Sequence, residues 1–136
     1  AVMSKLTRIA IISLCCLLIG AMIVGISAAI FYYTPRRCDT KDVSFSCTTT
    51  VSDNTATVCL SVDKPYNYNG YKCVEREETN GSVYAYLFIY GTYADQQIAS
   101  CDEDGTITLE IPLGEDVVRL ILQGEDSKKT IWIKGN

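Results

Sequence analysis

Cysteine is the residue type in this sequence with the widest possible chemistry, because thiols form disulfides, ligate metals and act as nucleophiles. Seven cysteines are present, and five of them follow a long apolar run: Cys38, Cys47, Cys59, Cys73 and Cys101. The 136 residues contain no histidine, which excludes Cys-His and Ser-His nucleophiles and removes a common zinc ligand. No C-x-x-C pair occurs. These cysteines therefore favour disulfides in an oxidising compartment, with no metal and no cofactor.

The expected strand registers restrict which cysteines can pair. A hairpin that closes Val51 against Ala56 would point Cys47 and Cys59 to opposite faces, so these two are not expected to bridge each other. The candidate disulfide cysteines are Cys47, Cys59, Cys73 and Cys101, and the pairings left open are Cys59 with Cys73 and Cys47 with Cys101. Five is an odd number, so at least one thiol stays unpaired, and Cys38 is the natural candidate.

Clustered carboxylates are the second possible source of chemistry. Residues 101–105 resemble the start of a calcium loop but lack its later ligands, so we interpret them as a solvated turn. Glu75, Glu77 and Glu78 are the right residue type for cleaving a glycoside, but charges spaced in this way are typical of an exposed strand edge. The sequence predicts no catalytic residue, no metal site and no cofactor, and so a protein that is not an enzyme.

Charge narrows the class of partner. Beyond residue 33 the chain has ten Lys/Arg and sixteen Asp/Glu, which gives that part a net charge of −6. Nucleic acids and anionic lipid headgroups favour basic surfaces. We therefore expect no nucleic-acid partner.

One segment must lie in an apolar environment. Residues 9–33 form an uncharged run, preceded by Lys5 and Arg8 and closed by aromatic residues 31–33. As a helix it is long enough to cross a bilayer. We expect a single-pass anchor with its N-terminus in the cytoplasm; the alternative is a signal peptide cleaved near residues 27–29.

Small residues mark one side of this expected helix. Ala21, Gly25 and Ala29 are spaced by four, the pattern that lets two helices approach closely. They are the candidate helix-packing residues. The alternative is that apolar helices are simply rich in glycine and alanine.

The rest of the chain alternates with a period of two, which is typical of strands. The expected strands are residues 43–51, 55–62, 71–79, 82–93, 106–111, 117–123 and 129–134. About seven strands with turns between them predict an all-β antiparallel sandwich, Ig-like or barrel-like, behind one hydrophobic transmembrane α-helix. The domains are then 1–33 (leader and hydrophobic helix), 34–42 (linker) and 43–136 (extracytoplasmic β-sandwich).

A hairpin at Asn80-Gly81 predicts an aromatic surface. This dipeptide favours a two-residue type I′ turn, and the register that follows gathers aromatic side chains on one face: Tyr71, Tyr84, Tyr86, Phe88 and Tyr90. This face is either a platform for a glycan or protein partner or the packing surface of another layer. We prefer the packing interpretation.

The whole layout resembles the type IV pilin-like subunits of archaea, in which a hydrophobic N-terminal helix precedes a small β head. The resemblance is architectural and involves no specific motif; position 5 is Lys where bacterial pilins commonly have Glu. It implies an extracellular filament with the helices packed in its core.

Two functions remain in view. The first is a non-enzymatic, single-pass membrane protein whose β-sandwich acts outside the cytoplasm in assembly or binding. The second is a pilin-like filament subunit. The partner of the helix is the lipid bilayer in the first case and other copies of the chain in the second.

Overall fold

The computed structural model describes residues 4–94 and 106–135, and the chain divides into two compact units, Ala1–Thr34 and Pro35–Asn136. The two units are described separately below as the helix and the head.

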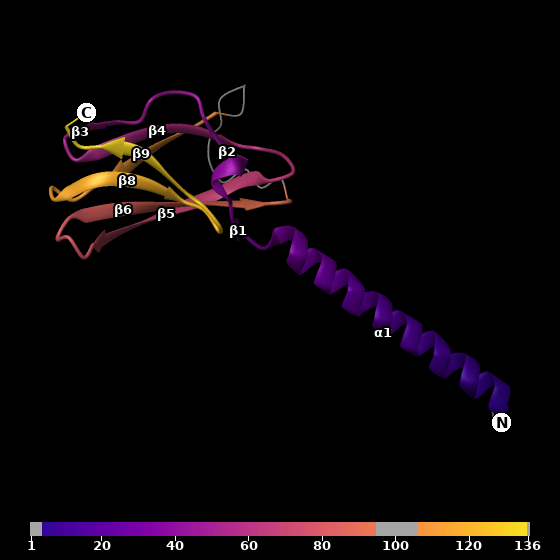
Figure 1. Ribbon diagram of the computed structural model, residues 1–136. Helices are drawn as coiled ribbons and strands as arrows, with labels where there is room; N and C mark the ends of the chain where they lie inside the picture. The colour runs from indigo at the N-terminus through magenta and orange to yellow at the C-terminus, as the bar shows by residue number, and fades with distance from the viewer. Residues whose placement is uncertain (1–3, 95–105, 136) are drawn as a thin grey trace. The chain divides into compact units, whose positions relative to one another are not determined.

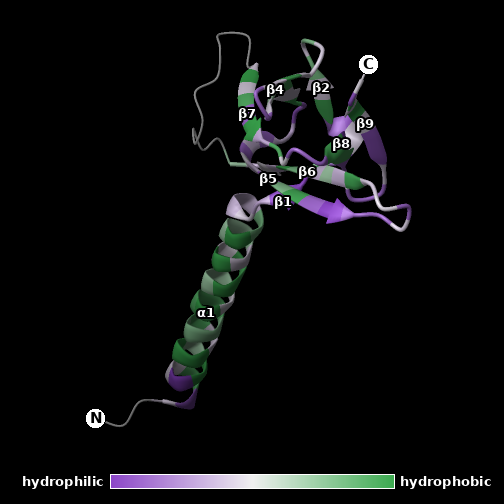
Figure 2. Cartoon of the chain, turned by 90° about the vertical axis from the view of Figure 1, so that its left-hand side faces the viewer, coloured by the Kyte–Doolittle hydropathy of each residue, from purple (hydrophilic) through white to green (hydrophobic). Residues whose placement is uncertain are grey.

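The helix, α1, runs from Lys5 to Tyr33. Ser4 caps its start, because its hydroxyl accepts a hydrogen bond from the backbone N–H of Thr7 at 3.2 Å. The helix ends before Pro35, which cannot continue it. None of its residues is buried, and Figure 2 shows apolar residues along most of its length. It is long and apolar enough to cross a bilayer, which confirms the expected N-terminal hydrophobic helix.

The head is a sandwich of two sheets, drawn as stacked layers in Figure 1. Within the described residues its strands and one 3-10 turn are β1 (Arg36–Arg37), η1 (Thr40–Asp42), β2 (Val43–Phe45), β3 (Thr50–Ser52), β4 (Thr55–Val62), β5 (Asn67–Glu77), β6 (Val83–Thr92), β7 (Ile107–Pro112), β8 (Val117–Gln123) and β9 (Lys128–Ile133). The expected helix followed by a β-sandwich is therefore confirmed.

Each sheet is built around one central strand. In the five-stranded sheet β6 pairs with β5 along one edge, and with β8 and β1 along the other; β9 then pairs with β8. In the four-stranded sheet β4 pairs with β7 along one edge, and with β2 and β3 along the other. One pairing differs from the expected antiparallel scheme: β6 and β8 are parallel. Two strands of one sheet can run parallel here because the chain passes through the other sheet, as β7, between them.

The core lies between the two sheets and consists of the inward residues of the strands. The apolar side chains that are 0% exposed in the two central strands are Ala56, Val58 and Leu60 of β4, and Ala85, Leu87 and Ile89 of β6. Buried residues of β7 and β8, such as Ile111 and Leu122, complete it. Burial of these apolar side chains is the main force that holds the two sheets together.

The expected single strand over residues 43–51 is interrupted. It forms β2 and β3, with a bend at Ser46 and Cys47 between them. The two pieces pair with β4 in different registers: Phe45 lies opposite Leu60, and Val51 lies opposite Ala56. The bend absorbs the two-residue difference between these registers. The predicted pairing of Val51 with Ala56 is confirmed.

The type I′ turn occurs in a different hairpin from the one expected. Asp53 and Asn54 both have positive φ, 52° and 59°, and join β3 to β4. At the other hairpin only Gly81 has positive φ, 84°, and its N–H donates to Glu78 O at 2.9 Å. The backbone N–H of Glu78 donates to Ser82 O at 2.7 Å. That loop has three residues rather than two, which changes the register of β5.

The expected linker, residues 34–42, belongs largely to the head. Arg36 and Arg37 form β1 against β6, and the backbone N–H of Cys38 donates to Ile89 O at 2.8 Å. The Cys38 side chain is buried in the core. Backbone pairing with the central strand and a buried side chain make this segment a structural part of the sandwich.

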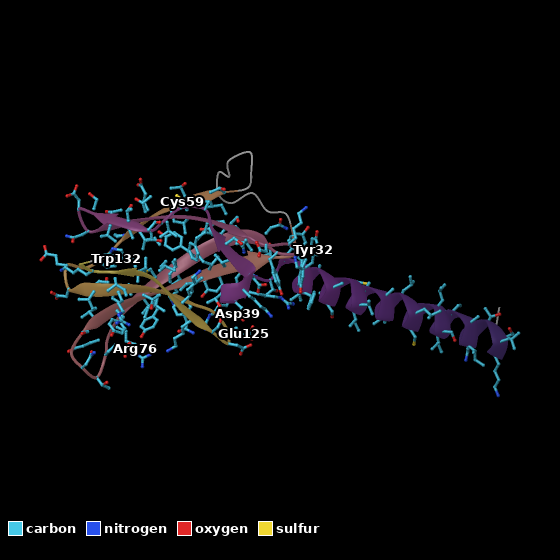
Figure 3. The ribbon with its side chains drawn as sticks, turned by 45° about the horizontal axis from the view of Figure 1, so that its top comes forward. Tyr32, Asp39, Cys59, Arg76, Glu125 and Trp132 are labelled. Carbon is cyan, nitrogen blue, oxygen red and sulfur yellow. The ribbon has the colours of Figure 1, made fainter. Side chains whose placement is uncertain are left out.

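Asp39 fastens the same segment to the β8–β9 turn, near Glu125 in Figure 3. The Ser127 hydroxyl donates to Asp39 Oδ1 at 2.6 Å, and this bond lowers the pKa of the carboxyl. Gly124 packs directly against Asp39, where a Cβ would collide with the carboxylate and the backbone of Thr40. Only glycine permits this close approach.

Candidate ligand-binding face

The candidate site lies on the outer face of the five-stranded sheet. Because the inward residues of β6 fill the core, its remaining side chains alternate outward: Tyr84, Tyr86, Phe88 and Tyr90. These four aromatic residues share one face, as the sequence predicts.

Tyr71 does not belong to that face. In the structure it lies opposite Ile89, whose side chain points into the core, whereas Gly70 lies opposite Tyr90. Residues directly opposite each other in a ladder share a face, so Tyr71 is on the other side of the sheet. The reason for the error is the three-residue loop at Gly81, which moves the register by one and exchanges the two faces of β5.

The new register brings cations, rather than Tyr71, to the aromatic residues. Five cations occupy this outer face: Arg37 of β1, Lys72 and Arg76 of β5, Arg119 of β8 and Lys128 of β9. They are half of the ten Lys/Arg that follow residue 33. We call these five cations and the four outward aromatic residues of β6 the basic-aromatic face.

Several of the cations lie over the aromatic rings. The distances from cation to ring centroid are 4.4 Å for Arg37 Cζ over Phe88, 5.3 Å for Arg119 Cζ over Tyr84 and 6.0 Å for Lys128 Nζ over Tyr86. Such contacts hold long side chains in place without neutralising them. Among the residues that the structure describes, no ion pair joins any of the five cations to a carboxylate. Within that part of the chain, these cations are therefore not held in ion pairs.

A carboxylate at the rim acts on tyrosine instead. The Tyr86 hydroxyl donates to the Glu78 carboxylate. This bond raises the pKa of Tyr86, with partial burial as the second cause. The interaction links the Tyr86 ring to Glu78, the residue that precedes the Gly81 loop.

The face is hollowed into a groove of about 350 Å³. The groove is lined by Arg37, Lys72, Val74, Arg76, Tyr86, Phe88, Tyr90, Gln123 and Lys128. Its volume is in the range of small-molecule sites, roughly 300–1,000 Å³. Four cations and three aromatic rings around one groove can hold an anionic group by charge-assisted hydrogen bonds while apolar atoms rest on the rings.

The sequence alone does not reveal these cations. Arg37, Arg119 and Lys128 come from β1, β8 and β9, none of which is next to β6 in the sequence. The expected register turned Lys72 and Arg76 away from the aromatic residues. Lys72 and Arg76 are four residues apart, which places both on one face of β5. Whether that face also holds the aromatic residues depends on the length of the loop at Gly81, which the sequence does not show.

The other candidate residues lie elsewhere. Ala21 and Gly25 line a hollow on the surface of α1 together with Ser13, Cys16 and Gly20, whereas Ala29 is exposed outside it.

The candidate acidic residues form no site. The acidic segment 101–105, including Cys101, lies outside the described residues. Glu75 accepts a hydrogen bond from Gly114 N at 3.1 Å, so it stabilises a turn. The described residues contain no group of His, Cys, Asp and Glu that could hold a metal ion.

The cysteines occupy two different environments. Cys38 and Cys73 pack against the core, and desolvation raises the pKa of their thiols to about 12 and about 11. Cys59 instead lies on the outer face of β4, since Val58 and Leu60 point inward. The pairing of Cys59 with Cys73, which the sequence leaves open, is thus excluded, because the two side chains lie on different sides of the four-stranded sheet.

The expectation that Cys47 and Cys59 point to opposite faces is also wrong. It assumed a continuous strand over residues 43–51, but the bend at Ser46 and Cys47 turns the chain after β2. The two thiols interact, and this interaction raises the pKa of Cys47.

Comparisons with family models, with curated proteins and with solved structures find no match to this chain.

Proposed function

We propose that this chain is a membrane-anchored binding protein that takes an anionic saccharide on the basic-aromatic face. In this proposal α1 spans the bilayer, the head lies outside the cytoplasm, and no chemical step is catalysed. The observation that carries the proposal is the gathering of five cations on one face, three of them over aromatic rings, in a head whose net charge is negative.

The chemistry of the groove favours a carboxylated or sulfated sugar among anions. Tyrosine rings offer apolar surface to the C–H face of a sugar, while their hydroxyls and the Gln123 amide offer hydrogen bonds. Lys72, Arg76 and Lys128 offer charge to its acidic groups. An acidic peptide would more readily add a strand to a sheet edge.

The test uses the full chain in detergent and three immobilised polymers of similar length: dextran sulfate, polygalacturonate and neutral dextran. We expect binding to the first two, weakening with added salt, and none to the third. The double variant Lys72→Gln/Lys128→Gln should bind about tenfold more weakly, since losing two charge contacts at roughly 0.7 kcal/mol each amounts to about 1.4 kcal/mol.

The matched control removes the same charge elsewhere on the head. Lys41→Gln/Lys64→Gln changes two exposed lysines that do not line the groove, and should bind within about twofold of the wild type. Equal losses in both double variants would reduce the effect to net charge. Tighter binding to a single-stranded oligonucleotide than to either acidic polysaccharide would overturn the choice of saccharide.

A filament subunit is the second candidate, favoured by the hollow on α1. Glycine and other small side chains line it, and nothing lies within 4 Å of a Cβ added at Gly20 or Gly25. A second helix packed there could approach closely. In this case α1 would pack against other copies of itself rather than against lipid alone.

Sedimentation and negative-stain microscopy distinguish the two candidates. Gly25→Leu fills the hollow, whereas Ser27→Leu places the same side chain two residues further on, on the opposite side of the helix. A filament subunit should assemble as wild type and as Ser27→Leu but not as Gly25→Leu. Monomers for all three proteins would eliminate the filament.

A further inference from the structure

The segment between β2 and β3 brings two thiols to one place on the four-stranded sheet. The ladder between β2 and β4 ends at Phe45, opposite Leu60. The next residue, Ser46, still donates its backbone N–H to Cys59 O at 3.1 Å. The chain then bends, and Cys47 is the residue at the bend. Cys47 is thus held beside Cys59 by a backbone hydrogen bond one residue away.

The side chain of Cys59 faces the same outer surface. Its neighbours along β4, Val58 and Leu60, are 0% exposed, so Cys59 points away from the core. Its sulfur lies 3.9 Å from the Thr108 hydroxyl of β7, on the side away from β2. Cys47 is exposed and Cys59 is half-buried. The mutual interaction of the two thiols raises the pKa of Cys47, as expected for two like groups in contact.

We propose that Cys47 and Cys59 form an intramolecular disulfide on the outer face of β4. The bond closes the segment from Cys47 to Cys59, with β3 and its turn, into a covalent loop. The bond would stabilise this segment, because β3 is only three residues long and lies on the edge of the sheet.

The oxidant required is a small-molecule or protein disulfide. The exposed Cys47 thiol loses its proton and its thiolate attacks that S–S bond, which forms a mixed disulfide and releases one thiolate of the oxidant. The Cys59 thiolate then attacks the Cys47 sulfur and displaces the second thiolate. The two protein thiols are oxidised by two electrons, the oxidant is reduced to two thiols, and the two protons pass to them.

The other described thiols of the head compete poorly. Cys38 and Cys73 are packed against the core, where the oxidant does not reach them, whereas Cys47 is exposed. Cys38 also lies against Gly91, where a Cβ would be 3.0 Å from its sulfur, so the thiol fills a closed space. Neither can reach the outer face of β4.

Cleavage before aspartate identifies the bond directly. Cuts before Asp42, Asp53 and Asp63 place Cys47 in fragment 42–52 and Cys59 in fragment 53–62. Further cuts before Asp39, Asp95 and Asp102 separate the remaining cysteines of the head, so that Cys38, Cys73 and Cys101 each lie in a different fragment. The purified full chain is treated with glutathione disulfide, free thiols are blocked with N-ethylmaleimide, and the digest is analysed without reduction. We expect 42–52 and 53–62 to be joined, about 2 Da lighter than the two thiol fragments together, because two hydrogens are lost.

Thermal unfolding supplies an independent measurement. Adding a reductant should lower the melting temperature of the oxidised wild type by about 5 °C or more, and should not change that of Cys59→Ser. The outcome does not depend on the saccharide or on where the head resides. A link from either fragment to the one that holds Cys101, or maleimide on both Cys47 and Cys59 after oxidation, would overturn the proposal, as would an equal effect of reductant on Cys59→Ser.

Discussion

The two sheets of the sandwich are built alike, each around one central strand, but their outer faces differ in the side chains that they carry. The outer face of the four-stranded sheet carries mostly hydroxyl groups, from Ser44, Thr50, Ser52, Thr55, Thr57, Ser61 and Thr108. The basic-aromatic face carries large rings under cations instead. Figure 3 shows the contrast through two labelled residues, Cys59 and Arg76, which lie on opposite sides of the head.

This difference shows that the residues needed for folding and the residues exposed on the basic-aromatic face are separate sets. Both central strands alternate between buried and outward residues in the same way, so either outer face would allow the core to form. Short hydroxyl side chains suit a strand surface that meets only water. A face that holds aromatic rings and half of the head's cations has more than solubility requires, and for this reason we propose it as the ligand-binding face.

The largest expected effects should be equal for the two sheets. Leu60→Ala in β4 and Leu87→Ala in β6 each empty a fully buried site, and we expect each to cost about 2–5 kcal/mol of unfolding free energy. Denaturant titration of both variants measures this. A cost near 1 kcal/mol or less for one variant only would show that the two sheets contribute unequally to the core.

Substitutions on the two outer faces should have different effects on stability. Phe88 is half-buried beneath the Arg37 guanidinium, so Phe88→Ala should cost about 2 kcal/mol through lost apolar contact and lost cation–π attraction. Thr57→Ala on the hydroxyl-rich face should change stability by about 0.5 kcal/mol or less. Similar values for both substitutions would remove the contrast between the faces.

The two hairpin turns offer a comparison of smaller size. Gly81→Ala should cost about 1 kcal/mol, because φ is 84° there while nothing lies within 4 Å of the added Cβ, so the cost is that of the backbone alone. Asn54 already has positive φ, 59°, and Asn54→Gly should be neutral or stabilising by a few tenths of a kcal/mol. A stabilising Gly81→Ala would contradict the loop geometry.

The smallest expected effect is a pH dependence of stability that comes from Tyr86 on the basic-aromatic face. The folded-state pKa of Tyr86 is raised above its ordinary value of 10.0 by the bond to Glu78. That stabilisation is therefore present below pH 10 and is lost as pH rises through the folded-state pKa. Melting temperatures between pH 8 and 12 should show the wild type losing its advantage over Tyr86→Phe, whereas Thr57→Val should keep a constant difference from the wild type. A difference between wild type and Tyr86→Phe that is independent of pH would contradict this linkage.

Alternation and composition predict most of the fold. The uncharged run gives α1, and the period of two gives the strands on which the core residues lie, because both patterns depend on local geometry and on burial. The parallel pairing of β6 with β8 was not foreseen. It depends on which sheet each strand joins, and no local pattern contains that information.

The candidate site could be predicted only in part, and one turn explains much of the error. Asn80-Gly81 favours a two-residue turn, yet the hydrogen bonds from Glu78 and Gly81 close a loop of three. One additional residue exchanges the faces of β5, and so removes Tyr71 from the aromatic residues and brings Lys72 and Arg76 to them. Likewise, the bend at Cys47 places this residue beside Cys59, although the sequence predicts that the two point to opposite faces. The registers of β2 and β3 differ by two residues, and a shift of two does not change the alternation of apolar and polar residues, so the sequence does not reveal the bend.

The direct attachment of α1 to β1 has a mechanical consequence. Only Thr34 and Pro35 separate the helix from a strand that is bonded to β6. Tension on an anchored helix would therefore enter the head at its central strand, and the two-residue β1 would be the first link to bear it. The buried Cys38 side chain would resist extraction next, and the Asp39–Ser127 bond would carry the load into the β8–β9 turn. In the proposed anchored protein, a pull on α1 would thus be shared by β1, β6 and the β8–β9 turn.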